Sequence, residues 1–407
     1  MKLPKGWSSK KVYDLADVCG GIQKGPHREP GANPVRYLTV AHVQRNRILT
    51  GDPRFFEVTP HELQRWRLEP LDILIIEGNG SADQVGRTAL YHGEFKECVH
   101  QNHVIRIRVD QKLISPHYLN AFFNSAVGQA AVQSQSMTSS GLRTLSVGRI
   151  RDIEIPFPPF PEQCMIADIL TTWDKALEKL DTLIAAKERR KQALMQQLLT
   201  GKKRFKGFEG KWTLRQFPDV FERVEQSVVG TPPHVLSITA GKGFVDQRKK
   251  FSRVIAGRNI ENYVHLRKGE FAYNKGNSDR YPQGCIYRLE EFEEGAVPNV
   301  WISFRLKAQI HSPLFYKHFF LAGGLNRQLQ RLINSGVRND GLLNLTPDNF
   351  FRVKVPVPPE IEQTKLGKLF EIFAEELSML HAKRDALDQQ KRGLMQQLLT
   401  GQVRVKP

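Results

Sequence analysis

The sequence lacks the features that mark membrane and secreted proteins. Its 407 residues contain no run of about 18 apolar residues, which is the length that a membrane-spanning helix needs. The N-terminal stretch MKLPKGWSSKKVYDL has no apolar signal core. Only 4 cysteines occur, and none stands in a CxxC spacing, so they indicate reduced thiols and neither a zinc site nor a disulfide framework. We therefore expect a cytoplasmic protein.

The motifs of common active sites are also missing. A glycine-rich loop begins at Gly78, but Asp83 stands where the last glycine of a GxGxxG nucleotide loop belongs. No NPPY/F adenine-methyltransferase motif is present, and the 12 histidines form no HExxH pattern. A nuclease-like set could be assembled only from scattered charges at Asp72, Glu94 and Lys96. The sequence therefore predicts no catalytic, metal or cofactor site.

Acidic residues are few in relation to basic ones. The chain has 42 Asp and Glu residues against 60 Lys and Arg residues, which gives a formal net charge of +18. Such a charge attracts nucleic acids, acidic substrates or membrane surfaces. The hydrophobic content of 40% is ordinary for a globular protein, and the length predicts two or three domains.

The sequence contains an internal repeat with a period of 200 residues. LMQQLLTG at residues 194–201 recurs without change at residues 394–401. The match continues upstream, where IPFPPFPEQ at residues 155–163 corresponds to VPVPPEIEQ at residues 355–363. Because a fixed-period repeat reflects a repeated structural unit, we expect two similar halves.

Each repeat ends in a long segment with a heptad pattern. Apolar residues fill eight of ten seam positions in each copy, at alternating spacings of three and four residues. The pattern predicts two long helices, and packing through a pseudo-twofold axis would make them an antiparallel coiled coil. Four charged residues interrupt the apolar seams: Lys187, Lys191, Arg384 and Lys391. Two interpretations are open: either these side chains reach solvent past the apolar seam, or they form a docking site for a partner.

The remainder of each half is rich in strand patterns. Residues 1–155 and 206–355 alternate β-branched and aromatic runs with glycine, proline and asparagine. The predicted fold is mixed α/β, with two similar β-rich domains held apart by the helix pair. The C-terminal LTGQVRVKP followed by the N-terminal MKLPKGW resembles the central LTGKKRFKGFEGKW, so Trp7 corresponds to Trp212 and the two chain ends should meet.

Two basic domains with one framework and different loops suit recognition of two short DNA sequences. Polar and basic loop residues read base edges and phosphates. The candidate DNA contacts in the first half are Gln44, Arg45, Arg47, Asn79, Ser81, Gln84 and Arg143. Those in the second half are Lys249, Lys250, Lys275, Asn277, Arg280, Arg338 and Asn339.

The repeated motifs resemble the conserved regions of specificity subunits of type I restriction–modification enzymes. They are IPFPPFPEQ…LMQQLLTGKKRF and VPVPPEIEQ…LMQQLLTGQVRV, and DILIIEGN and GEFAYNKGN are similar to segments of the family's recognition domains. The resemblance covers essentially the whole chain. It implies a first target-recognition domain at residues 1–155, a spacer helix at 156–205, a second recognition domain at 206–355 and a second spacer helix at 356–407.

The resemblance also implies a function and partners. A specificity subunit is non-catalytic and reads a bipartite, asymmetric site in double-stranded DNA, while its helices set the unread gap and bind two modification subunits. S-adenosylmethionine would be bound by those subunits, and ATP and Mg would be used by restriction subunits. The retention of both glutamines in the two copies suggests that both copies meet the same partner, through Gln196, Gln197, Gln396 and Gln397.

Two other functions remain open at this point. One is a self-contained DNA methyltransferase or nuclease, which would bind its own cofactor or metal. The other is a coiled-coil adaptor that binds protein only and would show no salt-sensitive DNA binding.

Overall fold

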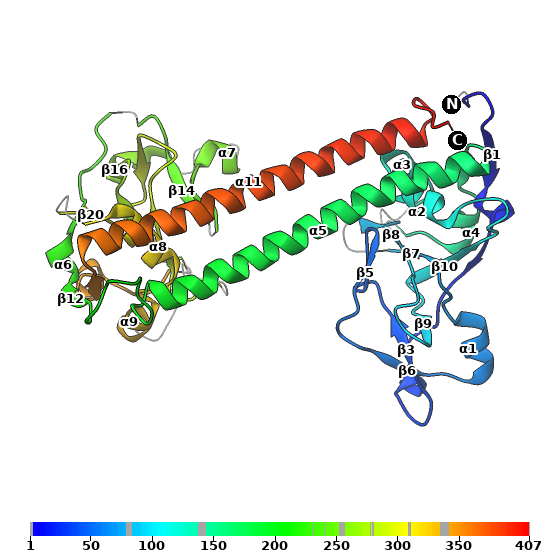
Figure 1. Cartoon of the computed structure of the whole chain (residues 1–407), viewed down its shortest axis with the longest axis horizontal. Coiled ribbons are helices and arrows are strands. Elements are labelled where there is room, and N and C mark those ends of the chain that lie inside the picture. The colour runs from blue at the N-terminus through cyan, green and yellow to red at the C-terminus, as the bar shows by residue number, and fades with distance from the viewer. Residues whose placement is uncertain are drawn as a thin grey trace. The chain divides into compact units, whose positions relative to one another are not determined.

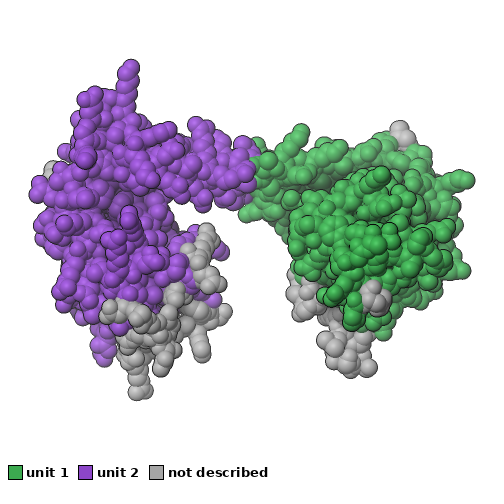
Figure 2. All heavy atoms as spheres, turned by 90° about the horizontal axis from the view of Figure 1, so that it is seen from below, with its two compact units in different colours: residues 1–182, 382–407 green, residues 183–381 purple. Residues whose placement is uncertain are grey.

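The computed structural model describes residues 3–78, 84–136, 144–230, 232–239, 241–251, 257–276, 278, 281–307, 311–333 and 342–406. The chain forms two compact units (Figure 2). Unit 1 contains residues 1–182 and 382–407, and unit 2 contains residues 183–381. Each unit combines strands with helices, so the predicted mixed α/β fold is confirmed. Within the described part of the chain, no helix is both long and apolar enough to cross a bilayer.

The main sheet of unit 1 has four antiparallel strands in the order β2-β10-β7-β8. Strand β7 is buried along its whole length because its sequence, ILII, is entirely apolar. Apolar side chains of the helices complete the core, and Tyr118 and Phe122 are almost fully buried. The elements are β2 (Ala16–Cys19), β7 (Ile73–Ile76), β8 (Thr88–Leu90), β10 (Val104–Val109), η1 (Val12–Asp14), α2 (Pro116–Asn124), α3 (Ala126–Ser136) and α4 (Val147–Arg151).

A smaller layer of unit 1 is built on a three-stranded sheet in the order β6-β3-β9 and on the hairpin β4-β5. Helix α1 begins with a capping box, in which Thr59 accepts from the Glu62 N–H and Glu62 accepts from the Thr59 N–H. The elements are η2 (Pro26–Arg28), β3 (Pro34–Leu38), β4 (Val43–Gln44), β5 (Arg47–Ile48), β6 (Phe55–Glu57), α1 (Pro60–Trp66) and β9 (Cys98–His100).

Unit 2 repeats the main sheet with the order β13-β20-β17-β18, again antiparallel. Its core is richer in aromatic rings, and Phe217, Phe221 and Phe304 pack against one another. The elements are α6 (Phe217–Val220), β13 (Phe221–Arg223), β14 (Leu236–Thr239), β15 (Gly243–Asp246), α7 (Gln247–Phe251), η4 (Gly257–Asn262), β16 (Val264–Arg267), β17 (Phe271–Asn274), β18 (Cys285–Arg288), β19 (Glu294–Val297), β20 (Ile302–Leu306), α8 (Pro313–Leu321), α9 (Asn326–Leu332) and α10 (Pro347–Phe350).

A two-stranded ribbon precedes each long helix, and its position repeats in both units. Strand β1 (Ser8–Lys11) pairs with β11 (Glu154–Phe157), and β12 (Thr213–Gln216) pairs with β21 (Lys354–Val357). Together with the shared sheet order, these ribbons confirm the internal repeat predicted from the sequence.

The long helices are α5 (Phe160–Leu198) and α11 (Glu360–Leu399), drawn in green and in orange to red in Figure 1. In unit 1, Asp181 pairs with Arg384 and Asp174 pairs with Lys391. A residue nearer the start of α5 thus pairs with a residue nearer the end of α11. The two helix segments in unit 1 are therefore antiparallel, as predicted. In unit 2, Lys187 pairs with Glu376 at 2.5 Å.

These ion pairs revise the interpretation of the charged residues in the seams. Lys187, Arg384 and Lys391 reach carboxylates on the facing helix, which neither sequence interpretation included. Lys391 is only 7% exposed, because Asp174 provides the charge that its burial requires. Lys191 is half-buried, and its pKa is lowered by burial and by the nearby Lys317.

Two buried glutamates join the start of each helix to the end of the other. In unit 1, Glu162 accepts hydrogen bonds from Nε and Nη2 of Arg404 at 2.8 and 2.7 Å. In unit 2, Glu362 accepts from Nε and Nη2 of Arg204, both at 2.5 Å. We call these the Arg–Glu forks. Bidentate guanidinium–carboxylate pairs combine charge with fixed geometry, so each fork sets where its two helix ends meet.

The glycine after each helix turns the chain toward its fork. Gly201 and Gly401 have φ angles of +70° and +69°, a left-handed conformation that glycine adopts without strain. A Cβ on Gly401 would lie 2.5 Å from Pro4 Cγ, and Arg404 Nη1 donates to the Lys5 carbonyl oxygen at 2.6 Å. The chain ends therefore meet in unit 1, as predicted, and Figure 1 shows their labels together.

We predict that Glu162→Gln lowers the thermal unfolding midpoint of the full chain by about 5 °C. The substitution removes the negative charge that pairs with Arg404, and hydrogen bonds to charged groups contribute about 2 kcal/mol. Glu154→Gln is the matched control, because Glu154 is exposed on β11. Equal midpoints for the two variants would contradict the role of the fork.

The effect of Glu162→Gln should also depend on pH. The Arg404 hydrogen bonds lower the pKa of Glu162 in the folded chain. The ionised carboxylate therefore stabilises the fold above its unfolded pKa, and this stabilisation is lost as the pH falls through the lowered folded pKa. The midpoint difference between wild type and variant should shrink over that acidic range, and a constant difference would count against the linkage.

Candidate nucleic-acid interface

The hairpin β4-β5 presents three of the residues predicted to contact DNA. Gln44 pairs with Arg47 across the strands, which leaves Arg45 and Asn46 as the turn. Asn46 has φ +56°, and asparagine is among the few residues that adopt this conformation readily. Arg45 and Arg47 are exposed, whereas Gln44 is half-buried and its Nε2 donates to the Ala41 carbonyl oxygen at 2.9 Å.

The side chain of Asn46 fixes this hairpin to helix α2. Its Oδ1 accepts from Nδ2 of Asn120 at 2.8 Å and from Nδ2 of Asn124 at 2.7 Å. Arg45 adds hydrogen bonds to Asn124 Oδ1 at 3.4 Å and to Gln129 Oε1 at 3.1 Å. Asn46 is not among the residues predicted from the sequence, although an asparagine in a two-residue turn between polar strand ends was a usable signal.

Buried Arg87 supports the hairpin from below. Its Nε donates to the Val43 carbonyl oxygen and its Nη2 to that of Val40, both at 2.7 Å. Its Nη1 donates to Oε1 of Gln84 at 2.6 Å. Gln84, which was predicted to contact DNA, therefore also helps to hold Arg87 beneath the hairpin.

The predicted contacts of unit 2 lie on different elements. Lys249 and Lys250 are exposed on α7, which follows the β14-β15 hairpin. Lys275 is half-buried after β17, and its Nζ donates to the Leu345 carbonyl oxygen at 3.4 Å. The two units therefore have the same sheet order but present different side chains.

Seven predicted contacts lie outside the described residues: Asn79, Ser81, Arg143, Asn277, Arg280, Arg338 and Asn339. The described residues that flank them repeat between the units. Gly78 bridges to Thr144 in unit 1, and Gly276 bridges to Leu342 in unit 2. In each unit, a described residue that precedes one predicted DNA-contact segment therefore pairs with a described residue that follows another such segment.

The four glutamines of the repeated motif occupy the last turns of the long helices. Gln196 and Gln397 are exposed, and Gln197 and Gln396 are half-buried. Their carbonyl groups take part in the helix caps, since the Lys203 N–H donates to Gln197 and the Val403 N–H donates to Gln397. These contacts use only the backbone of the glutamines, so the role of their side chains in partner binding stays a prediction.

The described residues contain no group of three or more His, Cys, Asp or Glu side chains arranged to hold a metal ion. Burial raises the pKa of Cys98 to about 12 and that of Cys285 to about 11, so both thiols are protonated at neutral pH and poor nucleophiles.

Comparisons with known proteins agree with this architecture. The family described as "Type I restriction modification DNA specificity domain" matches residues 4–188. The putative type I restriction enzyme MjaX specificity subunit of Methanocaldococcus jannaschii is 19% identical, over 100% of this chain and 95% of the relative. The StySPI specificity subunit of Salmonella potsdam is 28% identical, over 44% of this chain and 38% of its own length.

Solved structures show the same fold over the full length. The S subunit of a type I restriction–modification system from M. genitalium has a TM-score of 0.58 at 14% identity and covers 98% of both chains. A chain from a structure concerned with complex assembly of the type I R-M system also has a TM-score of 0.58, at 12% identity, and covers 99% of this chain and 100% of that one. This chain is therefore similar to type I restriction–modification specificity subunits, in sequence over residues 4–188 and in fold over its full length.

Proposed function

We propose that the chain is the DNA-recognition subunit of a type I restriction–modification complex. The observation that carries this proposal is the repetition of one sheet order in two units whose candidate contact residues differ. A common framework with different side chains suits two different half-sites, and the net charge of +18 favours DNA as the ligand. The same comparisons argue against a self-contained enzyme and against a protein-only adaptor, because the relatives are named as specificity subunits.

The proposed division of labour follows the repeat. Residues 1–155 read one half of an asymmetric site in double-stranded DNA, and residues 206–355 read the other half. The helices within residues 156–205 and 356–407 set the length of the unread gap. The four glutamines near the helix ends bind two modification subunits; they are Gln196, Gln197, Gln396 and Gln397. We further propose that the complex works in the cytoplasm, where it meets DNA.

In this proposal the chain itself catalyses no reaction. The modification subunits bind S-adenosylmethionine and methylate adenine, and restriction subunits use ATP and Mg. The chain contributes position and sequence choice, since its candidate contacts are guanidinium, ammonium and amide groups suited to phosphates and base edges.

The direct test is methylation by a reconstituted complex. The chain purified with its modification subunits should methylate one bipartite sequence, and the chain alone should methylate none. Methylation by the chain alone would refute the non-catalytic role. Methylation at a contiguous site would refute the reading of two separated half-sites.

We predict that inserting seven residues after position 182 and seven after position 382 lengthens the unread gap by about three base pairs. The two points face each other, because Asp181 pairs with Arg384 beside them. Seven residues restore the heptad seam, so both half-sites should stay unchanged. Two-residue insertions at the same points are the control; they turn the seam by about 200° and should abolish assembly. A changed half-site would contradict the spacer role.

We predict that Asn46→Gly weakens DNA binding by the full chain about tenfold, a loss equivalent to about 1.4 kcal/mol. Glycine keeps the positive φ, but it removes the hydrogen bonds that fix the hairpin to Asn120 and Asn124. Asp52→Gly is the matched control, because Asp52 has φ +51° and, among the described residues, its side chain pairs only with Arg54. Fluorescence anisotropy with a duplex measures both. Equal affinities for the two variants would show that the hairpin takes no part in binding.

A further inference from the structure

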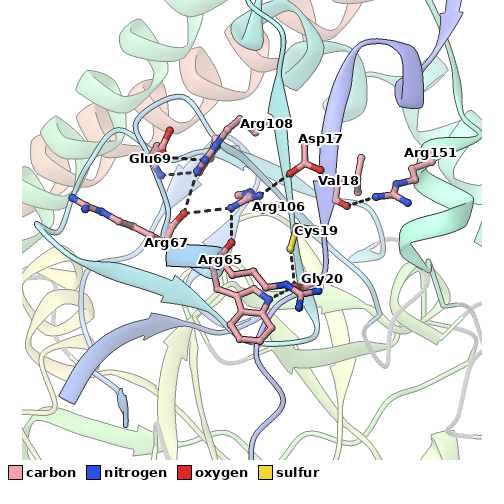
Figure 3. A network of polar contacts seen from close by, with 12 residues as sticks. Asp17, Val18, Cys19, Gly20, Arg65, Arg67, Glu69, Arg106, Arg108 and Arg151 are labelled. Carbon is pink, nitrogen blue, oxygen red and sulfur yellow. Dashed lines mark hydrogen bonds and ion pairs between the residues drawn. The ribbon is translucent and has the colours of Figure 1, made fainter. Parts of the chain in front are cut away.

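Unit 1 contains a basic hollow that no sequence pattern predicted. We call it the arginine hollow; it has a volume of about 540 Å³ and lies between β2, the end of α1, β10 and α4 (Figure 3). Its lining includes Asp17, Gly20, Arg65, Trp66, Arg106 and Arg151.

The lining carries more positive than negative charge. Arg65, Arg106 and Arg151 face it, and Asp17 is the one carboxylate among its lining residues. Asp17 pairs with Arg106 at 2.7 Å, and its side chain is 60% exposed. Because a solvated carboxylate screens a buried cation only in part, the hollow keeps a positive potential.

Arg106 forms the floor of the hollow. It is 5% exposed, and its Nη1 donates to the carbonyl oxygens of Arg65 at 3.2 Å and Arg67 at 3.4 Å. Its Nε is buried and makes no hydrogen bond to the described residues. Asp17 compensates the charge of this guanidinium in part, and further negative charge near it would complete the compensation. An anion in the hollow would provide that charge.

The walls of the hollow present two further guanidinium groups. Arg65, at the end of α1, lies 5.0 Å over the ring of Trp66, and the Trp66 Nε1 donates to the Gly20 carbonyl oxygen at 2.9 Å. Arg151, on α4, is exposed and donates from Nη2 to the Val18 carbonyl oxygen at 3.0 Å. Each guanidinium has five N–H donors, so these contacts leave donors available to a ligand.

The loop beside the hollow is held in place by close packing. A Cβ on Gly21 would lie 2.3 Å from the carbonyl oxygens of both His100 and Gln101, so only glycine fits there. The Trp66 hydrogen bond fixes Gly20 from the other side. This edge of the hollow is therefore already in place before a ligand binds.

Unit 2 has no equivalent group at the same sheet positions among its described residues. Strands β10 and β20 occupy the same place in the sheet order, and Ser303 of β20 stands where β10 has Arg106. Glu225 stands where the first unit has Gly20. These two differences remove a positive charge and add a negative one, so the hollow distinguishes unit 1.

We infer that the arginine hollow binds a backbone phosphate of the DNA duplex beside the half-site of unit 1. Arg65 and Arg151 hydrogen-bond the phosphate oxygens from opposite walls, and Arg106 supplies charge from below. A phosphodiester suits this set because guanidinium groups bind its planar pairs of oxygens and phosphate contacts fix the register of a protein on DNA. The inference rests on the proposed DNA-recognition function.

The test measures the salt dependence of duplex binding by the full chain with Arg65→Ala and Arg151→Ala combined. Arg67→Ala is the control, because Arg67 is exposed near the same helix end, does not line the hollow and points away from it in Figure 3. The double variant should bind about tenfold more weakly, and its slope of log K against log salt should fall by about 0.9, the loss expected for one phosphate contact. The control should keep the wild-type slope.

A second measurement uses inorganic phosphate. At matched ionic strength, phosphate should raise the thermal midpoint of the wild-type chain above its value in chloride, and it should not do so for the double variant. A phosphate effect with an unchanged DNA slope would overturn the DNA assignment and indicate a site for free phosphate. An equal loss of slope in the Arg67→Ala control would also overturn it, since general charge would then be the cause.

The outcomes separate this inference from the proposed function. If wild type binds no duplex even with its modification subunits, DNA recognition itself fails, and the hollow inference fails with it. If wild type binds and the double variant keeps the full slope, only the arginine hollow is refuted.

Discussion

The two Arg–Glu forks are the interactions on which the remaining arrangement of each unit depends. Glu162 and Glu362 are 4% and 1% exposed, so each needs a cation that stays in place. The neighbouring Gln163 and Gln363 accept from the N–H groups of Ser115 and Ser312, which cap helices α2 and α8. One turn of each long helix thus joins the other long helix and the main core. A shift of this turn would break all of these contacts together.

The helix pair combines an apolar seam with ion pairs that select its alignment. Apolar side chains contribute burial in many registers, because one leucine replaces another with little loss. The pairs from Asp174 to Lys391 and from Asp181 to Arg384 require one register and an antiparallel orientation. Removing one partner would leave a charge at the seam, and the cost is greatest at Lys391, which is the most buried.

The sequence was sufficient for the repeat, the long helices and the meeting of the chain ends, because these depend on patterns that recur along the chain. The Arg–Glu forks could have been predicted, since Glu162 and Arg204 recur at Glu362 and Arg404. The contacts of Asn46 could not, because Asn120 and Asn124 approach it only through folding. The same holds for the arginine hollow, whose lining comes from four elements far apart in sequence.

The candidate DNA contacts were only partly predictable for a related reason. The exposure of Lys249 was expected from its charge, but the structure places it on the short helix α7 and not in a loop. Gln84 looked equally exposed in the sequence, but it accepts a hydrogen bond from buried Arg87 and so supports other residues. A polar residue in a loop pattern does not reveal whether its side chain faces solvent or the interior.

The pair between Asp174 and Lys391 makes the two halves unequal as building blocks. Lys191 and Lys391 correspond in the repeat, but the counterpart of Asp174 is Ala374. Two copies of the first half placed in this antiparallel arrangement would offer each Lys191 an Asp174 from the other copy. Two copies of the second half would place each Lys391 opposite an alanine. This pair alone would therefore favour two copies of the first half over two copies of the second. The pairs Asp181–Arg384 and Lys187–Glu376 instead need one half of each kind, because Ile184 corresponds to Arg384 and Ala176 to Glu376.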